Sequence, residues 1–162
     1  MSGCSLTAEA RSSRTAETVL REWREASPVL IKLWPADWAV TQWVGLTFGD
    51  APHDGVLLKI DMPGMGLASV PATLAEIKTL GYLNLRDNML ESVPESLGDF
   101  DWLTCLNLER NRLSIIPSGL GRLNRLKTLY LTGNPWQFKG ALPREWSLNN
   151  DLRQVSGCDF RY

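Results

Sequence analysis

A spacing of 23 residues recurs through the middle of this chain and constrains its fold more than any other feature. Residues 103–117 read LTCLNLERNRLSIIP, and a shift of 23 positions backward finds matching residue types at seven sites, from Leu80 to Pro94. The pattern extends forward to Asn134 and backward to Leu57. Periods of about 20 to 50 residues are typical of solenoids, in which each unit buries its apolar side only against its neighbours.

Each repeat is predicted to form a strand, a turn and a return segment. In residues 80–85 and 103–108 leucines alternate with polar residues, as in a short strand with one face inward. After the proline of the repeat, Leu97, Phe100 and Leu103 recur every third residue, which suits a helical or 3₁₀ return on the outer side. The coils must then stack into one continuous core.

One asparagine per repeat lies among the leucines, at Asn88, Asn111 and Asn134. A buried amide without partners costs about 1 to 3 kcal/mol, so we expect these side chains to bond backbone groups that point inward at the turn. The first repeat has Met65 at this position. Either its turn, residues 63–66 with two glycines, has another conformation, or a cap supplies the missing hydrogen bonds.

The unit LxxLxLxxNxLxxxPxxLxxL resembles a leucine-rich repeat. Its proline and the amphipathic segment that follows are similar to the 23-residue class of intracellular Ras-associated and plant repeat proteins. The resemblance covers about half of the chain, residues 57–136, and implies an α/β solenoid with a short curved array of about four coils and parallel strands on the concave face. Since such repeats bind very different partners on one scaffold, the resemblance indicates the fold more strongly than the function.

Residues 15–56 are expected to form a helical N-terminal cap, preceded by a disordered segment of residues 1–14. Pro28 is expected to end a helix in which four apolar residues recur at helical spacing, namely Ala16, Val19, Leu20 and Trp23. This helix and the later segment WVGLTF resemble the region before the first coil of plant-type repeat domains. The cysteine pair of secreted caps of that type is missing, which implies an intracellular relative.

Four of the seven tryptophans fall before residue 44. We expect them to fill the irregular space over the open end of the first coil, because aromatic side chains bury much area where the backbone is irregular. The alternative is a platform for a carbohydrate or a peptide. The four are Trp23, Trp34, Trp38 and Trp43.

Residues 137–162 are expected to form a C-terminal cap and tail. The segment TGNPWQF, residues 132–138, resembles the opening of a C-terminal cap whose extracellular form continues with cysteines, and Phe138 stands in that place. Residues 140–143 could instead belong to one more repeat with a three-residue insertion. The last residues, 149–162, could either pack or fray.

Charge and cysteine content favour a single soluble domain in a reducing compartment. The 162 residues include 17 basic and 18 acidic side chains, a balance that gives no overall attraction to nucleic acid or to an anionic membrane. The N-terminus lacks the apolar run of a secretory signal, and no uninterrupted apolar stretch reaches the roughly 20 residues of a membrane helix. The cysteines are three, an odd number that forms no dense disulfide framework. We therefore expect a cytoplasmic protein without membrane insertion, and a monomer.

Patterns for catalysis, metal binding or cofactor binding are lacking in the sequence. It contains no phosphate-binding loop, zinc-ligand spacing or dinucleotide fingerprint. An enzyme could be built only on Cys105 and on His53, the single histidine, and a nucleophilic thiol would need a base or a cation beside it. We therefore expect no catalytic residues, no cofactor and no metal site.

The strand residues between the leucines should point away from the core and form columns across the stack. Tyrosine and arginine, which dominate binding hot spots, occur among them. The candidate partner-binding residues on this concave face are Lys59, Asp61, Tyr82, Asn84, Arg86, Asp87, Asn107, Glu109, Arg110 and Tyr130.

The sequence therefore predicts a non-enzymatic scaffold for protein binding in signalling, with the partner on the concave strands. The family resemblance implies a small GTPase, a kinase or a phosphatase as that partner. The alternative is a structural element that self-associates or caps a larger complex. Light scattering would separate the two, because the first predicts a monomer and the second a defined oligomer.

Overall fold

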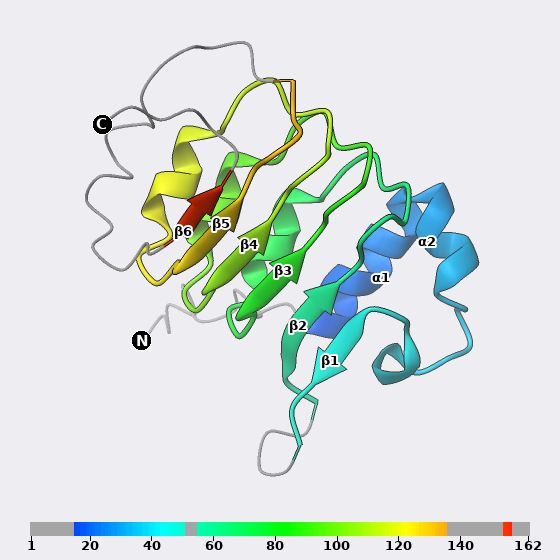
Figure 1. Ribbon diagram of the computed structural model, residues 1–162. Helices are drawn as coiled ribbons and strands as arrows, with labels where there is room; N and C mark the ends of the chain where they lie inside the picture. Colours follow the sequence, from blue (N-terminus) through cyan, green and yellow to red (C-terminus); the bar gives the residue numbers. More distant parts are fainter. Residues whose placement is uncertain (1–14, 51–54, 136–153, 157–162) are drawn as a thin grey trace, which may run out of the picture.

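Six short strands form one sheet in the order of the chain (Figure 1). The computed structural model describes residues 15–50, 55–135 and 154–156. The first two strands are antiparallel, and every later pair of neighbours is parallel, which confirms the predicted α/β solenoid. The strands are β1 (Leu46–Phe48), β2 (Leu57–Asp61), β3 (Tyr82–Asn84), β4 (Cys105–Asn107), β5 (Thr128–Tyr130) and β6 (Gln154–Ser156).

The parallel sheet continues past residue 136, where the repeats were expected to end. In β5 and β6 the paired residues Thr128 and Gln154 are 26 positions apart, whereas Lys59 and Tyr82 in β2 and β3 are 23 apart. One more coil with a three-residue insertion, the alternative raised for residues 140–143, has this spacing. The expected disordered segment 1–14 and the rest of residues 137–162, Phe138 included, lie outside the described residues.

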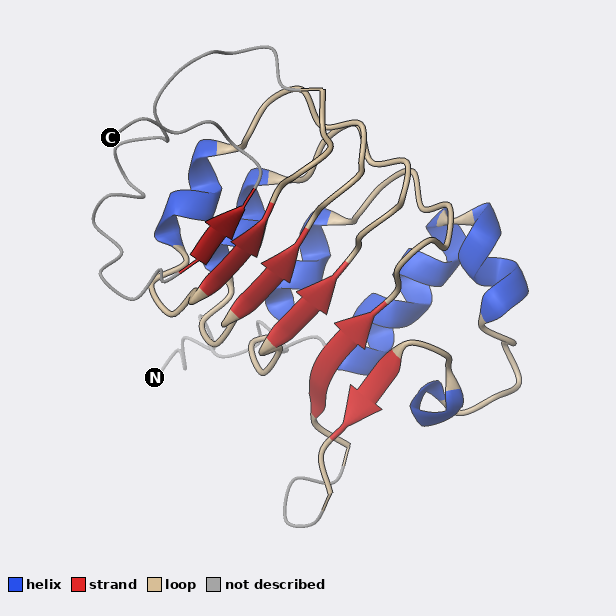
Figure 2. Cartoon of the chain, viewed as in Figure 1, coloured by secondary structure: helices blue, strands red, loops and turns tan. Residues whose placement is uncertain are grey.

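Three 3₁₀ helices cover the back of the sheet, each directly after the proline of its repeat (Figure 2). Proline fixes φ near −65° and suits the position before a helical turn; Pro71, Pro94 and Pro117 have φ of −71°, −68° and −60°. A 3₁₀ helix has three residues per turn, which matches the apolar spacing of the return segments. The helices are η2 (Ala72–Glu76), η3 (Glu95–Asp99) and η4 (Ser118–Arg122).

The N-terminal segment consists of α1 (Ala16–Ala26), α2 (Pro28–Leu33) and the short η1 (Val40–Gln42). Thr15 caps α1 by accepting a hydrogen bond from the backbone N–H of Thr18. The first helix ends before Pro28, as expected, and the same proline also opens α2, with Ser27 as the cap. Proline is tolerated at the first helical position because that N–H has no partner within the helix.

Three tryptophans fill the space between α1, α2 and the first coil. Trp23, Trp34 and Trp43 are buried, with the first pair edge to face at 5.9 Å and the second pair stacked at 4.8 Å between ring centroids. Each indole N–H donates to a backbone carbonyl. Trp38 differs, since half of its surface is exposed (50%). The three buried rings therefore offer no platform to a ligand.

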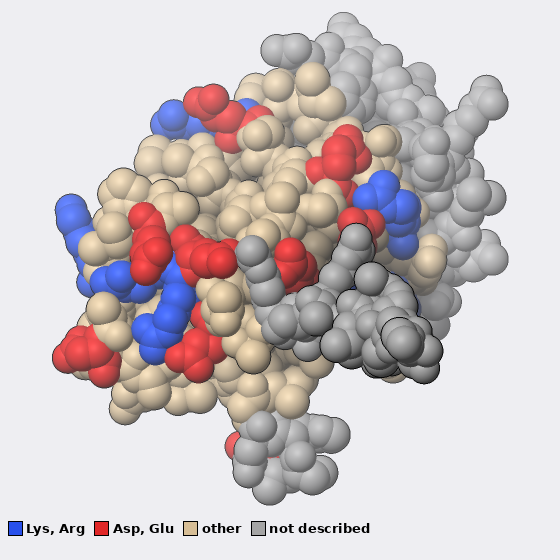
Figure 3. All heavy atoms as spheres, turned by 180° about the vertical axis from the view of Figure 1, so that it is seen from behind, with Lys and Arg blue, Asp and Glu red and all other residues tan. Residues whose placement is uncertain are grey.

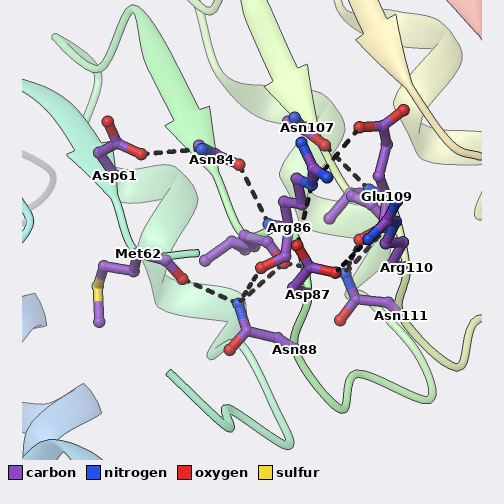
Figure 4. A network of polar contacts seen from close by, with 12 residues as sticks. Asp61, Met62, Asn84, Arg86, Asp87, Asn88, Asn107, Glu109, Arg110 and Asn111 are labelled. Carbon is purple, nitrogen blue, oxygen red and sulfur yellow. Dashed lines mark hydrogen bonds and ion pairs between the residues drawn. The ribbon is translucent and has the colours of Figure 1, made fainter. Parts of the chain in front are cut away.

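The asparagines of the repeats bond to the backbone of two coils at once (Figure 4). Asn111 is 5% exposed, and its Oδ1 accepts a hydrogen bond from the N–H of Leu90 at 3.1 Å. Its Nδ2 donates to the carbonyl of Leu85 in the preceding coil at 2.9 Å and to that of Leu108 in its own coil at 3.1 Å. The corresponding bonds recur at Asn88 and Asn134.

This arrangement explains the methionine of the first coil. The N–H of Leu67 and the carbonyl of Met62 are both bonded by Asn88 of the next coil, each at 2.9 Å. An asparagine at position 65 would serve a coil before β2, where the antiparallel β1 lies instead. The hydrogen bonds thus come from the next coil and not from a cap. The turn matches its equivalents at Gly64, with φ of 67° against 54° at Asp87, but Gly66 is also left-handed, with φ of 72°, whereas the equivalent Met89 is not. The other conformation expected for the two glycines is therefore present at Gly66.

Candidate functional site

The candidate residues on the strands lie in two rows on the concave face, which we define as the face of the sheet turned away from the 3₁₀ helices (Figure 2). The strand register places equivalent residues of successive coils side by side, and the leucine or isoleucine between the rows is buried in each strand. The first row is Lys59, Tyr82, Cys105 and Thr128, and the second is Asp61, Asn84, Asn107 and Tyr130.

A polar cluster links the first two coils of this face. Nζ of Lys59 lies 2.8 Å from Oδ2 of Asp61, and Nδ2 of Asn84 donates to Oδ1 of the same carboxylate at 2.8 Å. The hydrogen bond to Asp61 raises the pKa of Lys59. Burial raises the pKa of Asp61, but the hydrogen bonds from Lys59 and Asn84 outweigh it and leave that pKa below its usual value. Both groups are therefore charged at neutral pH.

Tyr82 completes this cluster. Its ring lies 4.6 Å from the ammonium nitrogen of Lys59, a cation–π contact. Burial, together with the nearby carboxylate of Asp61, raises the pKa of the Tyr82 phenol. The phenol consequently stays protonated at neutral pH and can donate a hydrogen bond to a partner.

A row of alternating charges follows the strands in the turns (Figure 4). Nε of Arg86 lies 2.9 Å from the carboxylate of Asp87 and 3.9 Å from that of Glu109. Arg110 reaches the same Asp87 at 3.7 Å. These side chains are partly exposed, and such ion pairs contribute about 0 to 1 kcal/mol each. They can exchange partners at low cost, so the row is adaptable.

Two asparagines on the strands are oriented by hydrogen bonds from the backbone. Oδ1 of Asn84 accepts from the N–H of Arg86 at 3.1 Å, and Oδ1 of Asn107 accepts from the N–H of Glu109 at 3.0 Å. Within the described residues, neither Nδ2 of Asn107 nor the hydroxyl of Tyr130 has a hydrogen-bond partner. The concave face therefore carries fixed, half-buried polar groups that a partner can satisfy.

Of the two residues on which an enzyme could be built, the structure describes Cys105 alone. Cys105 is a free, half-buried thiol on β4. Burial raises its pKa, an effect that the charge of Lys59 only partly offsets. His53 lies outside the described residues. Among the residues that are described, no group of three or more histidine, cysteine, aspartate or glutamate side chains could hold a metal ion.

The raised pKa of Cys105 predicts slow alkylation. With Cys4 and Cys158 replaced by serine, iodoacetamide at pH 8 should modify the protein more slowly than a short cysteine peptide, because less thiolate is present at that pH. The midpoint of the pH–rate profile should lie above that of the peptide. Lys59→Gln should move the midpoint further upward, since it removes the favourable charge. A midpoint at or below the peptide value would contradict this account.

Two surface features were missed by the sequence analysis. A groove of about 370 Å³ lies between α2 and the turn that follows β2, residues 63–66. Trp102, before β4, is exposed and has the guanidinium of Arg125 stacked on its ring. The signal for this stack is present in the sequence, because the repeat period aligns Trp102 with Thr79 and Arg125, a position that the core does not require to be aromatic.

Comparison with known proteins identifies the repeat and the fold. The family model described as Leucine Rich Repeat matches residues 102–123. No curated protein matches the chain by sequence. None of the described helices has the length and apolar character that a membrane span needs.

Solved structures of plant proteins are similar over most of the chain. The BIR2 ectodomain from Arabidopsis thaliana is 22% identical, covers 88% of this chain and 77% of its own, and has a TM-score of 0.69. The BIR3–SERK2 complex from the same plant gives 22% identity, 89% and 79% coverage and a TM-score of 0.70. The leucine-rich repeat ectodomain of the receptor kinase SOBIR1, also from Arabidopsis, gives 18% identity, 92% and 95% coverage and a TM-score of 0.59. At these identities the likeness shows the shared fold.

Proposed function

We propose that this leucine-rich repeat protein is a non-enzymatic interaction module that holds a protein partner on its concave face. The proposal rests on one observation: two rows of half-buried polar and aromatic side chains are displayed in register on a sheet whose other side is a continuous leucine core. One of the structures with the same fold is itself a complex of two proteins, BIR3 and SERK2.

The concave face is suited to binding because little of it must be ordered on association. The strand backbones are held by the coil-to-coil register, and the polar cluster of Lys59, Asp61 and Asn84 is already hydrogen bonded. Binding energy is therefore not consumed in fixing these side chains. Tyr82 and Arg86 lie beside this cluster, and their residue types carry most of the energy in many interfaces.

The charges of this face favour a partner without a strong net charge. Among the described residues of this face, the cationic side chains of Lys59, Arg86 and Arg110 are each paired with a carboxylate of the same face. The predicted partner is a small GTPase, a kinase or a phosphatase, because the repeat resembles that of the Ras-associated class. A cytoplasmic location, a monomeric state, a role in signalling and the absence of enzymatic activity are part of the same proposal.

Affinity capture from cytosol tests the proposal. The double variant Tyr82→Ala, Arg86→Ala should retain at least about 30-fold less of the partner than the wild type, the loss expected on truncating a hot spot worth about 2 kcal/mol. The matched control is Glu91→Ala, Arg112→Ala, which removes two exposed side chains outside the concave rows and should capture the partner normally. Circular dichroism should show that all three proteins are folded.

Equal capture by the wild type and the concave double variant would overturn the assignment to this face. Light scattering of the purified protein adds an independent check. A monomer agrees with an interaction module, whereas a defined oligomer that the concave substitutions disrupt would favour the structural or assembly role.

A further inference from the structure

A second surface lies where the parallel strands begin. We define the strand-start edge as the three turns that lead into β3, β4 and β5, residues 78–81, 101–104 and 124–127 (Figure 1). Backbone hydrogen bonds join these turns to each other and to β2: the N–H of Gly81 donates to Leu58, and the N–H of Thr104 donates to Gly81, both at 2.9 Å. The backbone of the edge is therefore tied to the sheet by the same kind of hydrogen bonds that join the strands.

The most prominent side chain of this edge is Trp102, which is 54% exposed. The guanidinium carbon of Arg125 lies 3.8 Å from the centroid of its ring. A guanidinium stacked on an aromatic ring is held in place while its N–H groups stay free at the edge of the plane. Tryptophan and arginine are also the residue types most enriched in binding hot spots.

Two cations of this edge are not neutralised by a carboxylate: within the described residues, neither Arg125 nor Lys127 forms a salt bridge. On the back of the molecule, by contrast, acidic and basic side chains are interspersed (Figure 3), and Arg122 pairs with Asp99 at 2.8 Å. The three turns contain the basic residues Lys78, Arg125 and Lys127 against one acidic residue, Asp101.

An apolar surface adjoins these charges. Leu58 on β2 is 41% exposed. The backbone of Gly81 lies beside the backbones of Leu58 and Trp102, since a Cβ atom at position 81 would be 3.7 Å from the carbonyl oxygen of Leu58 and 3.9 Å from that of Trp102. Position 81 itself has no side chain that would cover this part of the edge.

We propose that the strand-start edge binds an acidic peptide segment of a partner protein that also carries apolar side chains. A carboxylate of the segment would accept two hydrogen bonds from the guanidinium of Arg125, in the planar geometry that arginine and carboxylates share. Lys127 supplies further attraction, and an apolar side chain of the segment contacts Trp102 and Leu58. This surface uses none of the residues assigned to the concave face and does not depend on that assignment.

A titration followed by NMR tests this site. The probe is a synthetic peptide with the sequence Glu-Leu-Glu-Glu-Phe-Glu, blocked at both ends, and its control is the same peptide with glutamine in place of glutamate. The acidic peptide should shift the indole N–H signal of Trp102, which is assigned by its loss in Trp102→Phe. The glutamine peptide should bind at least about five-fold more weakly, and affinity for the acidic peptide should fall as salt rises from about 0.05 to about 0.5 M.

Matched variants locate the binding. Arg125→Gln should weaken binding of the acidic peptide at least about five-fold, while Arg112→Gln, which removes another exposed arginine, should not. The concave double variant Tyr82→Ala, Arg86→Ala should bind the peptide as the wild type does, so that the two proposals are tested separately. Equal affinity for the two peptides, equal affinity of Arg125→Gln and wild type, or shifts confined to residues outside this edge would overturn the proposal.

Discussion

Replacement of Gly98 by alanine is expected to lower the free energy of unfolding by about 3 kcal/mol or more, at the upper end of what overpacking costs. Gly98 lies in η3, and a Cβ atom there would come within 1.7 Å of the carbonyl oxygen of Gly119 in η4. That obstacle is backbone, so a side-chain rotation cannot relieve it. The two 3₁₀ helices would have to move apart and expose part of the leucine core between them.

Urea unfolding followed by circular dichroism measures this effect. The matched control is Gly81→Ala, where the new Cβ would have no neighbour among the atoms around it closer than 3.7 Å, an ordinary van der Waals contact. Gly81→Ala should therefore leave the midpoint almost unchanged. Similar midpoints for Gly98→Ala and the wild type would mean that η3 and η4 are less closely apposed than the structure shows.

Replacement of Asn111 by alanine should cost about 2 to 3 kcal/mol. The N–H of Leu90 loses its acceptor and stays buried, which is the main loss. The carbonyl oxygens of Leu85 and Leu108 keep one donor each, from Asn88 and Asn134. The cost therefore arises chiefly from one unsatisfied donor and from the loss of the amide bridge between two coils.

Two further variants separate these contributions. Asn111→Asp keeps an acceptor for Leu90 but places an oxygen where Nδ2 faces carbonyl oxygens, so it should also destabilise the fold. Asn124→Ala, on the exposed strand-start edge, is the matched control and should change the unfolding midpoint little. If Asn111→Ala unfolded at the same urea concentration as Asn124→Ala, the asparagine ladder would not contribute to stability.

The repeat period alone predicts much of the molecule. Side chains alternate along a strand, so equivalent leucines such as Leu83 and Leu106 point inward. The period brings equivalent residues into register, so Tyr82 and Cys105 lie side by side on the concave face. The 3₁₀ return after each proline follows from the spacing of three between its apolar residues. These features are local or periodic, so they can be recognised without the structure.

Contacts between coils could not be predicted from the period. Gly98 shares its repeat position with Ala75, so the sequence does not indicate that a methyl group is excluded at residue 98. The period likewise does not say that Asn88 serves the coil before its own, and this offset is the reason why the first coil can have Met65.

The sequence by itself thus determined the coil, its strand register and the rows of the concave face, since all three depend on spacing along the chain. Only the tertiary structure decided which polar groups meet: Lys59 with Asp61, Asn84 with the same carboxylate, and Arg125 with the ring of Trp102. Such pairs depend on the distance between neighbouring coils and on the direction that each side chain takes, and the order of the residues specifies neither.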